Sequence, residues 1–180
     1  MLYSDDAVQE LISYFSKVDE PTAIVFFGDH QPNLPEDFYN TLLESQRGNL
    51  SDAELRQKKM VTPFFIWANY DIKEQTNMQI SANYLSAYAL NALGCSTSGF
   101  DQMRLALQQQ IPVMNVNGYR LPETIESKLD GTIKLLYRLP DGNWYPQSEQ
   151  PENDLLNDYH NAEYAQIFDA KNRSDEWYTP

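Results

Sequence analysis

An unbroken apolar run at residues 22–27 (TAIVFF) is the feature that most constrains the fold of this chain. It does not alternate between apolar and polar residues, as a strand with one solvated face does. Such runs are typical of strands covered on both faces, as in a parallel sheet flanked by helices. Upstream, Val8, Ile12 and Phe15 have the spacing of one apolar helix face. The order helix, short loop, buried strand predicts an α/β fold.

The rest of the chain continues this pattern as one folded unit. Residues 64–68 form a second apolar run, and a capping-box pattern at residues 51–54 predicts a helix start. The further elements expected are helices at residues 81–93, 100–110 and 155–168, and a hairpin of residues 133–139 and 144–145 around Asp141-Gly142. We expect residues 1–170 to form one domain and residues 171–180 to be a weakly ordered tail.

Composition excludes several classes of function. Lys and Arg number 13 and Asp and Glu number 26, so the formal net charge is −13. A field of this sign repels phosphate backbones, which disfavours nucleic acids and anionic membrane surfaces as partners. Cys95 is the single cysteine, so an intrachain disulfide and a C-x-x-C metal site are both excluded. No apolar run approaches the roughly 20 residues of a membrane span.

Gly28-Asp29-His30 is the sharpest local signal for chemistry. It directly follows the first apolar run, at the carboxyl end of a strand, where open α/β sheets place their ligand sites. A carboxylate oxygen and an imidazole nitrogen suit zinc, manganese or iron. The alternative is structural: Asp29 caps the next segment, and His30 is a partly buried polar residue. The local pattern leaves both interpretations open.

Other candidates have plainer interpretations. His160 lies in an expected surface helix with no partner evident in the sequence, and Cys95 is better explained as a small packed thiol than as a nucleophile. Four aromatic residues of the last third can either stack on sugar rings or fill the core: Trp144, Tyr145, Trp177 and Tyr178.

Residues 21–32 (PTAIVFFGDHQP) resemble a segment of the lipoteichoic acid synthase family of phosphoglycerol transferases, within the sulfatase and alkaline phosphatase superfamily. Segments similar to later parts of that family follow in order at residues 62–70, 80–94, 111–113 and 163–169. The resemblance implies part of an alkaline phosphatase-like sandwich. Its expected form is a mixed, mostly parallel sheet flanked by helices, with a C-terminal hairpin.

The same resemblance implies roles for two residues. Asp29 and His30 would be ligands of a catalytic divalent cation, with Mn²⁺ the expected metal. In such enzymes the metal activates a threonine nucleophile, and a covalent phosphoglycerol intermediate passes to a polymer hydroxyl or to water. The family's nucleophile lies upstream of Gly-Asp-His, and neither Thr22 nor Thr62 matches its position. We therefore expect residues 1–170 to be the C-terminal portion of a sulfatase-like catalytic domain, containing no catalytic nucleophile.

The resemblance also implies partners and a location. The parent enzyme would act on an anionic glycerophosphate lipid or polymer, or on a sulfate ester, at the extracytoplasmic face of a bacterial membrane. Its membrane contact would come only through upstream helices, and exposed strand edges would allow homo-oligomers. The alternative is a non-catalytic extracytoplasmic module that binds glycans through exposed aromatics or serves as a protein-interaction domain.

The two hypotheses predict different behaviour of the purified 180-residue chain. As an enzyme portion without a nucleophile, it should show no phosphodiesterase turnover with Mn²⁺ present; measurable metal-dependent turnover would contradict this expectation. As a glycan-binding module, it should bind saccharide in a chelator-insensitive manner and lose that binding in Trp144→Ala.

Overall fold

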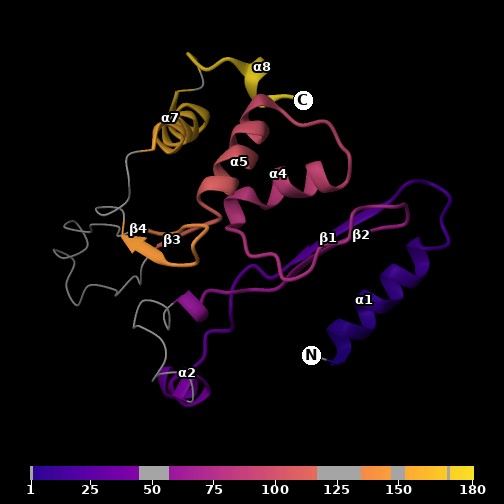
Figure 1. The fold of residues 1–180 in the computed structure, drawn as a ribbon. Helices are drawn as coiled ribbons and strands as arrows, with labels where there is room; N and C mark the ends of the chain where they lie inside the picture. Colours follow the sequence, from indigo (N-terminus) through magenta and orange to yellow (C-terminus); the bar gives the residue numbers. More distant parts are fainter. Residues whose placement is uncertain (1, 45–56, 117–134, 147–152, 170) are drawn as a thin grey trace.

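The computed structural model describes residues 2–44, 57–116, 135–146, 153–169 and 171–180. Helices and short strands are interspersed along these residues, which confirms the α/β class. The elements are α1 (Leu2–Phe15), β1 (Ala23–Phe27), α2 (Glu36–Leu43), β2 (Phe64–Ala68), α4 (Ala82–Ala92), α5 (Gly99–Gln110), β3 (Val113–Val116), β4 (Leu135–Arg138), β5 (Trp144–Pro146), α7 (Asp154–Phe168) and α8 (Asp175–Tyr178) (Figure 1). The expected helix start at residues 51–54 lies outside the described residues.

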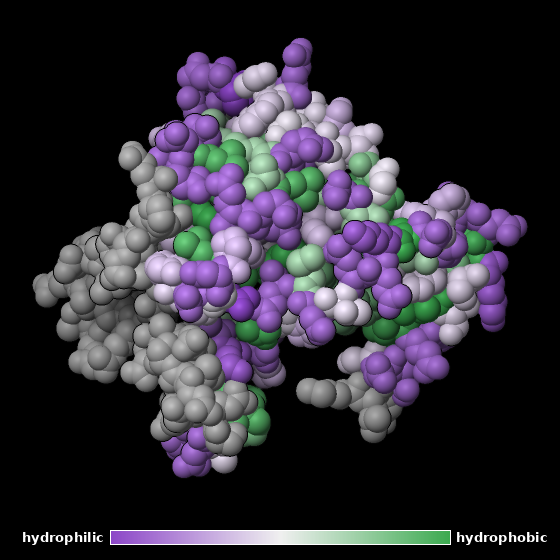
Figure 2. Space-filling view, viewed as in Figure 1, coloured by the Kyte–Doolittle hydropathy of each residue, from purple (hydrophilic) through white to green (hydrophobic). Residues whose placement is uncertain are grey.

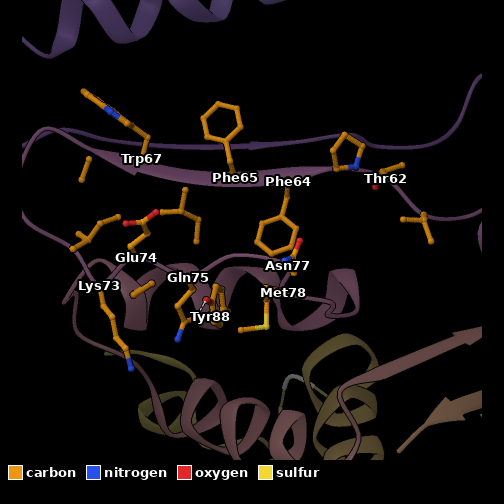
Figure 3. Close-up of a pocket in the computed structure, with 16 residues that line it drawn as sticks. Thr62, Phe64, Phe65, Trp67, Lys73, Glu74, Gln75, Asn77, Met78 and Tyr88 are labelled. Carbon is orange, nitrogen blue, oxygen red and sulfur yellow. Dashed lines mark hydrogen bonds between the residues drawn. The ribbon is translucent and has the colours of Figure 1, made fainter. Parts of the chain in front are cut away.

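Both apolar runs form strands, and they pair with each other. β1 and β2 are antiparallel, with Val25 opposite Ile66 and Phe26 opposite Phe65. The Phe26 and Phe65 rings stack with centroids 5.1 Å apart. The sheet lies between α1 on one face and α4 on the other (Figure 3). The expectation that the first apolar run is covered on both faces is nevertheless wrong, because Val25, Phe26 and Phe27 of β1 are exposed.

The expectation of a mostly parallel sheet is wrong for the described residues. The strands form a two-stranded sheet, β1-β2, and a three-stranded sheet, β3-β4-β5, and every pairing in them is antiparallel. The physical reason is that the apolar character of a strand does not specify its direction, which its connections and its partner strands set.

The predicted hairpin is confirmed as β4 and β5. Gly142 has φ +85°, the left-handed conformation that glycine adopts at little cost. The turn is closed by hydrogen bonds from Leu139 N to Asn143 O (3.1 Å) and from Gly142 N to Leu139 O (2.9 Å). Asp141 accepts from the Tyr145 hydroxyl at 2.7 Å. Asp-Gly therefore supplies both the turn geometry and a side-chain acceptor.

The core is centred on the helices rather than on the β1-β2 sheet. Its largest fully buried side chains come from α4, α5, the residue after α5, β4 and α7: Tyr84, Leu107, Ile111, Tyr137 and Tyr159. The helix ends predicted from sequence are confirmed. Ser81 is the N-cap residue of α4, and Gly94, just past its end, has φ +71°.

The last residues pack onto this core. The expected weakly ordered tail contains α8, whose Trp177 ring lies 5.7 Å from the Phe100 ring. Tyr178 donates a hydrogen bond from its hydroxyl to Ala162 O at 2.9 Å. A Cβ at Gly99 would lie 2.2 Å from Trp177 Cδ1. Any larger residue at position 99 would therefore clash with the Trp177 ring.

A buried carboxylate anchors the start of α5. Asp101 Oδ2 accepts hydrogen bonds from Ser98 N (2.9 Å) and Ser98 Oγ (2.7 Å), and Ser98 Oγ accepts from Asp101 N (3.1 Å), which completes a capping box. Arg104 adds an ion pair to Asp101. Burial by itself raises the pKa of Asp101, but the hydrogen bonds from Ser98 and Arg104 outweigh it and lower the pKa below its usual value.

The lowered pKa predicts a pH-dependent cost for Asp101→Asn. A carboxylate with a depressed folded-state pKa contributes stability that is complete above its unfolded value of about 3.9 and is lost as the pH falls through the folded value. At pH 7 we expect Asp101→Asn to lower the free energy of unfolding by about 1–2 kcal/mol in urea denaturation. The difference from wild type should shrink at about pH 3.

Asp175→Asn is the matched control, because the Asp175 carboxylate also pairs with an arginine but is 76% exposed. Its cost should stay below about 0.5 kcal/mol at both pH values. A cost of Asp101→Asn that does not change with pH would show that carboxylate charge is not its source.

Candidate functional site

The Gly-Asp-His segment leaves the end of β1 and is held against the residues that precede β2. Gly28 N donates to Pro63 O at 3.0 Å, which extends the β1-β2 ladder by one pair. A Cβ at Gly28 would lie 3.0 Å from Thr62 Cβ. Because Gly28 has no side chain, the backbone after β1 can lie close to Thr62 and Pro63. This close contact fixes the position from which the side chains of Asp29 and His30 extend.

Asp29 and His30 lie side by side at this exit. His30 Nε2 is 3.2 Å from Asp29 Oδ2, and the His30 backbone N donates to Asp29 Oδ1 at 2.9 Å. Their side chains are 80% (Asp29) and 77% (His30) exposed. The structural alternative is not what the described residues show, because Pro35 is the N-cap residue of the next helix, α2, and His30 is exposed rather than partly buried.

The hydrogen bonding of the imidazole leaves one nitrogen available as a ligand. His30 Nδ1 lies 2.9 Å from Gln31 O. A backbone carbonyl accepts only, so Nδ1 carries a hydrogen in this contact, and Nε2 is the nitrogen that faces the Asp29 carboxylate; to bind a cation, Nε2 would have to carry no hydrogen. Histidine ligands of metals are commonly oriented by such a bond from the other ring nitrogen.

The spacing of the two donor atoms is also suited to one cation. Two ligands at about 2.1 Å from a metal and at right angles to each other lie about 3 Å apart, close to the 3.2 Å between His30 Nε2 and Asp29 Oδ2. The described residues contain no cluster of three or more His, Cys, Asp or Glu side chains that could hold a metal ion. Within the described chain, the site is therefore a pair of donors.

Two anchors of this loop are not evident from the sequence. Gln31 Nε2 donates to Val61 O, and the Tyr39 hydroxyl donates to Pro32 O. Both bonds join side chains to backbone carbonyls, which every residue type offers, so no sequence motif marks them.

A cavity of about 510 Å³ begins beside this loop and runs between β2 and α4. Phe64 and Tyr88 face each other across it, with ring centroids 6.4 Å apart and planes nearly perpendicular (Figure 3). The Tyr88 hydroxyl donates to Gln75, and burial raises the pKa of Tyr88. Asp29 and His30 do not line the cavity; Thr62 lines it and also contacts Gly28.

The remaining sequence candidates lie elsewhere. His160 is half-buried, with Nδ1 3.8 Å from Glu163 Oε2, and Glu163 also accepts from the Tyr159 hydroxyl. His160 therefore has a partner on its own helix and belongs to a network of the core. Cys95 is exposed rather than packed, because it follows the left-handed Gly94 out of α4. Of the aromatic candidates, Trp177 is 36% exposed, and Trp144, Tyr145 and Tyr178 are half-buried.

Comparison with known proteins gives one family and one structure. The family model described as Sulfatase matches residues 1–95, just over half of the chain. Among solved structures, the chain is similar to the Streptococcus pyogenes phosphoglycerol transferase GacH in complex with sn-glycerol-1-phosphate, with 17% identity and a TM-score of 0.45. The match covers 70% of this chain and 28% of that one, so this chain spans less than a third of the length of GacH. The comparison with curated proteins found no match.

Proposed function

The chain belongs to the sulfatase family, and from that premise we propose that it forms part of a metal-dependent enzyme that acts on phosphate or sulfate esters. The finer proposal is a phosphoglycerol transferase or phosphodiester hydrolase of the lipoteichoic acid synthase type, working on cell-envelope lipids or polymers. The observation that carries the proposal is the Asp29–His30 pair at the exit of β1, with its donor atoms 3.2 Å apart.

In this proposal Asp29 and His30 are two ligands of a divalent cation, with Mn²⁺ the metal favoured by the family resemblance. The residues fit that role: Nδ1 is held by the Gln31 carbonyl, so Nε2 is the nitrogen that can bind a cation when it carries no hydrogen, Oδ2 is an anionic oxygen beside it, and both side chains are exposed. When bound, such a cation neutralises charge on an ester under attack and activates an oxygen nucleophile.

This chain's own residues position the two ligands. The Gly28–Pro63 hydrogen bond fixes the loop to the ladder, and the Gln31 carbonyl holds the imidazole by Nδ1. The Gln31 side chain in turn binds Val61 O, so one residue fixes both the ring and its loop. The remaining ligands and the nucleophile belong, in this proposal, to parts of the enzyme beyond these described residues.

The proposed substrate is an anionic glycerophosphate lipid or polymer, and the proposed location is the extracytoplasmic face of a bacterial membrane. Similarity to the lipoteichoic acid synthase segments motivates both. None of the helices in the described residues has the length and apolar character to cross a membrane.

The chain's two histidines make a direct test of the metal site possible. Mn²⁺ broadens the NMR signals of protons near it, so substoichiometric Mn²⁺ should broaden the His30 ring signals and leave those of His160 sharp. His160, which also lies beside a carboxylate, is thus an internal control. Asp29→Asn should reduce the broadening of His30, because it removes the anionic ligand while keeping the shape of the side chain.

The proposal predicts that EDTA restores the His30 signals and that His160→Ala leaves their broadening unchanged. Equal broadening of both histidines, or broadening of His30 that Asp29→Asn does not alter, would remove the metal assignment. Binding should be weak, with a Kd on the order of 1 mM, because two ligands leave most of the coordination sphere to water.

A further inference from the structure

A second cavity, of about 590 Å³, lies between α4, α5 and the segment that precedes α4. Gln75, Met78 and Tyr88 line this cavity and also the cavity beside β2, so the two adjoin (Figure 3). Its volume lies within the range of about 300–1,000 Å³ that is usual for ligand pockets. All of its lining residues lie within residues 75–109. This chain therefore forms the cavity walls without another part of the domain.

Carboxamide side chains dominate the lining of this cavity, and none of the described residues that line it is charged. The carboxamides belong to Gln75, Asn91, Gln102, Gln108 and Gln109, and the other lining residues are Met78, Tyr88, Leu105 and Ala106. The chain as a whole carries 26 acidic and 13 basic residues. The neutral wall favours a neutral ligand, because it has no Lys or Arg to bind an anion and no carboxylate to bind a cation.

Helical spacing sets the face of α5 that lines the cavity. Gln102, Leu105, Ala106 and Gln109 are spaced as i, i+3, i+4 and i+7, so they share one face of the helix. Leu107, on another face, is fully buried in the core. Figure 2 shows hydrophilic and hydrophobic surface interspersed over α4 and α5. The cavity face of α5 thus presents two carboxamides with two apolar side chains between them.

Gln108 is the observation that points to a ligand. Only 6% of Gln108 is exposed, and within the described chain no hydrogen bond reaches its side chain. Buried polar groups are nearly always hydrogen-bonded, because leaving one without a partner costs free energy. The Gln108 carboxamide at the cavity wall therefore has two N–H donors and a carbonyl acceptor available to a molecule in the cavity.

Other carboxamides of the wall also keep free groups. Asn91 is exposed, and its side chain makes no hydrogen bond with the described residues. Gln75 accepts from the Tyr88 hydroxyl through Oε1, which leaves its Nε2 as a donor. Gln102 donates to Thr97 Oγ1 through Nε2, which leaves its Oε1 as an acceptor. The wall thus offers both donors and acceptors.

This combination of groups fits a sugar. A sugar hydroxyl both donates and accepts, as a carboxamide does. The Tyr88 ring, Met78 and Leu105 supply apolar surface for the C–H groups of a sugar ring. An extended peptide is disfavoured, because it binds through the unpaired backbone groups of a strand edge, whereas α4 and α5 are helices.

We propose that the cavity between α4 and α5 binds a neutral saccharide, about the size of a disaccharide, through the carboxamides of Gln108, Asn91 and Gln75. The inference does not rest on the proposed metal chemistry, because Asp29 and His30 do not line this cavity. None of the aromatic residues of the last third of the chain lines it either. The site is therefore distinct from glycan binding through exposed aromatic side chains.

The test uses the full 180-residue chain in EDTA and a panel of neutral disaccharides: maltose, cellobiose, lactose and diacetylchitobiose. At least one of them should shift the side-chain NH₂ signals of Gln108 and Asn91 in NMR titrations. We expect a Kd on the order of 1 mM, because each hydrogen bond to the protein replaces one to water. Glucuronic acid and sn-glycerol-1-phosphate should bind at least about tenfold more weakly, because no cationic side chain lines the cavity.

Gln108→Leu and Gln110→Leu are a matched pair of variants on α5. Gln110 does not line the cavity, and its Oε1 already accepts from Asn153 Nδ2 at 2.9 Å. Gln108→Leu should weaken disaccharide binding at least about tenfold, whereas Gln110→Leu should leave the Kd within about twofold of wild type. Because Gln108 has no partner to lose, Gln108→Leu should melt at or above the temperature of wild type. Asn91→Ala, at an exposed position, should weaken binding at least about threefold.

Several results would overturn the proposal. Absence of binding by every disaccharide of the panel at about 20 mM would reject the saccharide site. Equal binding of sn-glycerol-1-phosphate would remove the neutral ligand class. Loss of binding in Trp144→Ala would assign the sugar to the exposed aromatic residues instead. A Gln108→Leu variant that melts below wild type and still binds the disaccharide would make Gln108 structural. Each of these results leaves the Mn²⁺ test unaffected, because that test is read at His30.

Discussion

Pairing of β1 with β2 is the constraint on which the candidate site depends. The ladder sets Gly28 against Pro63 and so fixes where Asp29 and His30 leave the sheet. At the other end, Asn69 Nδ2 donates to Val18 O (2.8 Å) and Glu20 O (2.9 Å), and Asn69 Oδ1 accepts from Thr22 N (2.8 Å). One side chain thus joins the turn after α1 to both strands. The site loop and the α1 turn are tied to the two ends of the same five-residue ladder.

The β1-β2 ladder and the helical core differ in how much of their apolar surface is buried. The buried aromatic cluster belongs to α4, α5, β4 and α7, where Phe100 and Tyr159 stack with ring centroids 6.0 Å apart. β1, by contrast, keeps Phe27 more than half exposed. Stability is therefore concentrated away from the proposed metal ligands, and the sulfatase family match at residues 1–95 includes the less buried part. Functional segments are often placed on such less stable parts of a fold.

The fold could be predicted wherever a local cause was sufficient. Gly94 ends α4 because a left-handed exit is a local property. Asp141-Gly142 placed the hairpin for the same reason. Ser81 stands at the N-cap position as predicted, but its hydroxyl bonds to the backbone of Met114 rather than to the first turn of the helix. Both the burial of β1 and its pairing direction were predicted wrongly, because a run of apolar residues does not specify which segments of the chain cover it or which strand lies beside it. Contacts of Gln31 with Val61 could not be foreseen, because their acceptor is a backbone carbonyl distant in sequence.

By itself, the sequence determined that this chain is an α/β protein of strongly acidic charge, with a Gly-Asp-His exit after an apolar strand, and these properties depend on residue type and spacing alone. Only the tertiary structure decided that Asp29 Oδ2 and His30 Nε2 converge to 3.2 Å, that β1 pairs antiparallel with β2, and that the other edge of β1 has no partner among the described residues. The pairing of β1 with β2 joins segments about 40 residues apart in the chain, and a sequence pattern does not specify which backbone groups of two distant segments bond to each other.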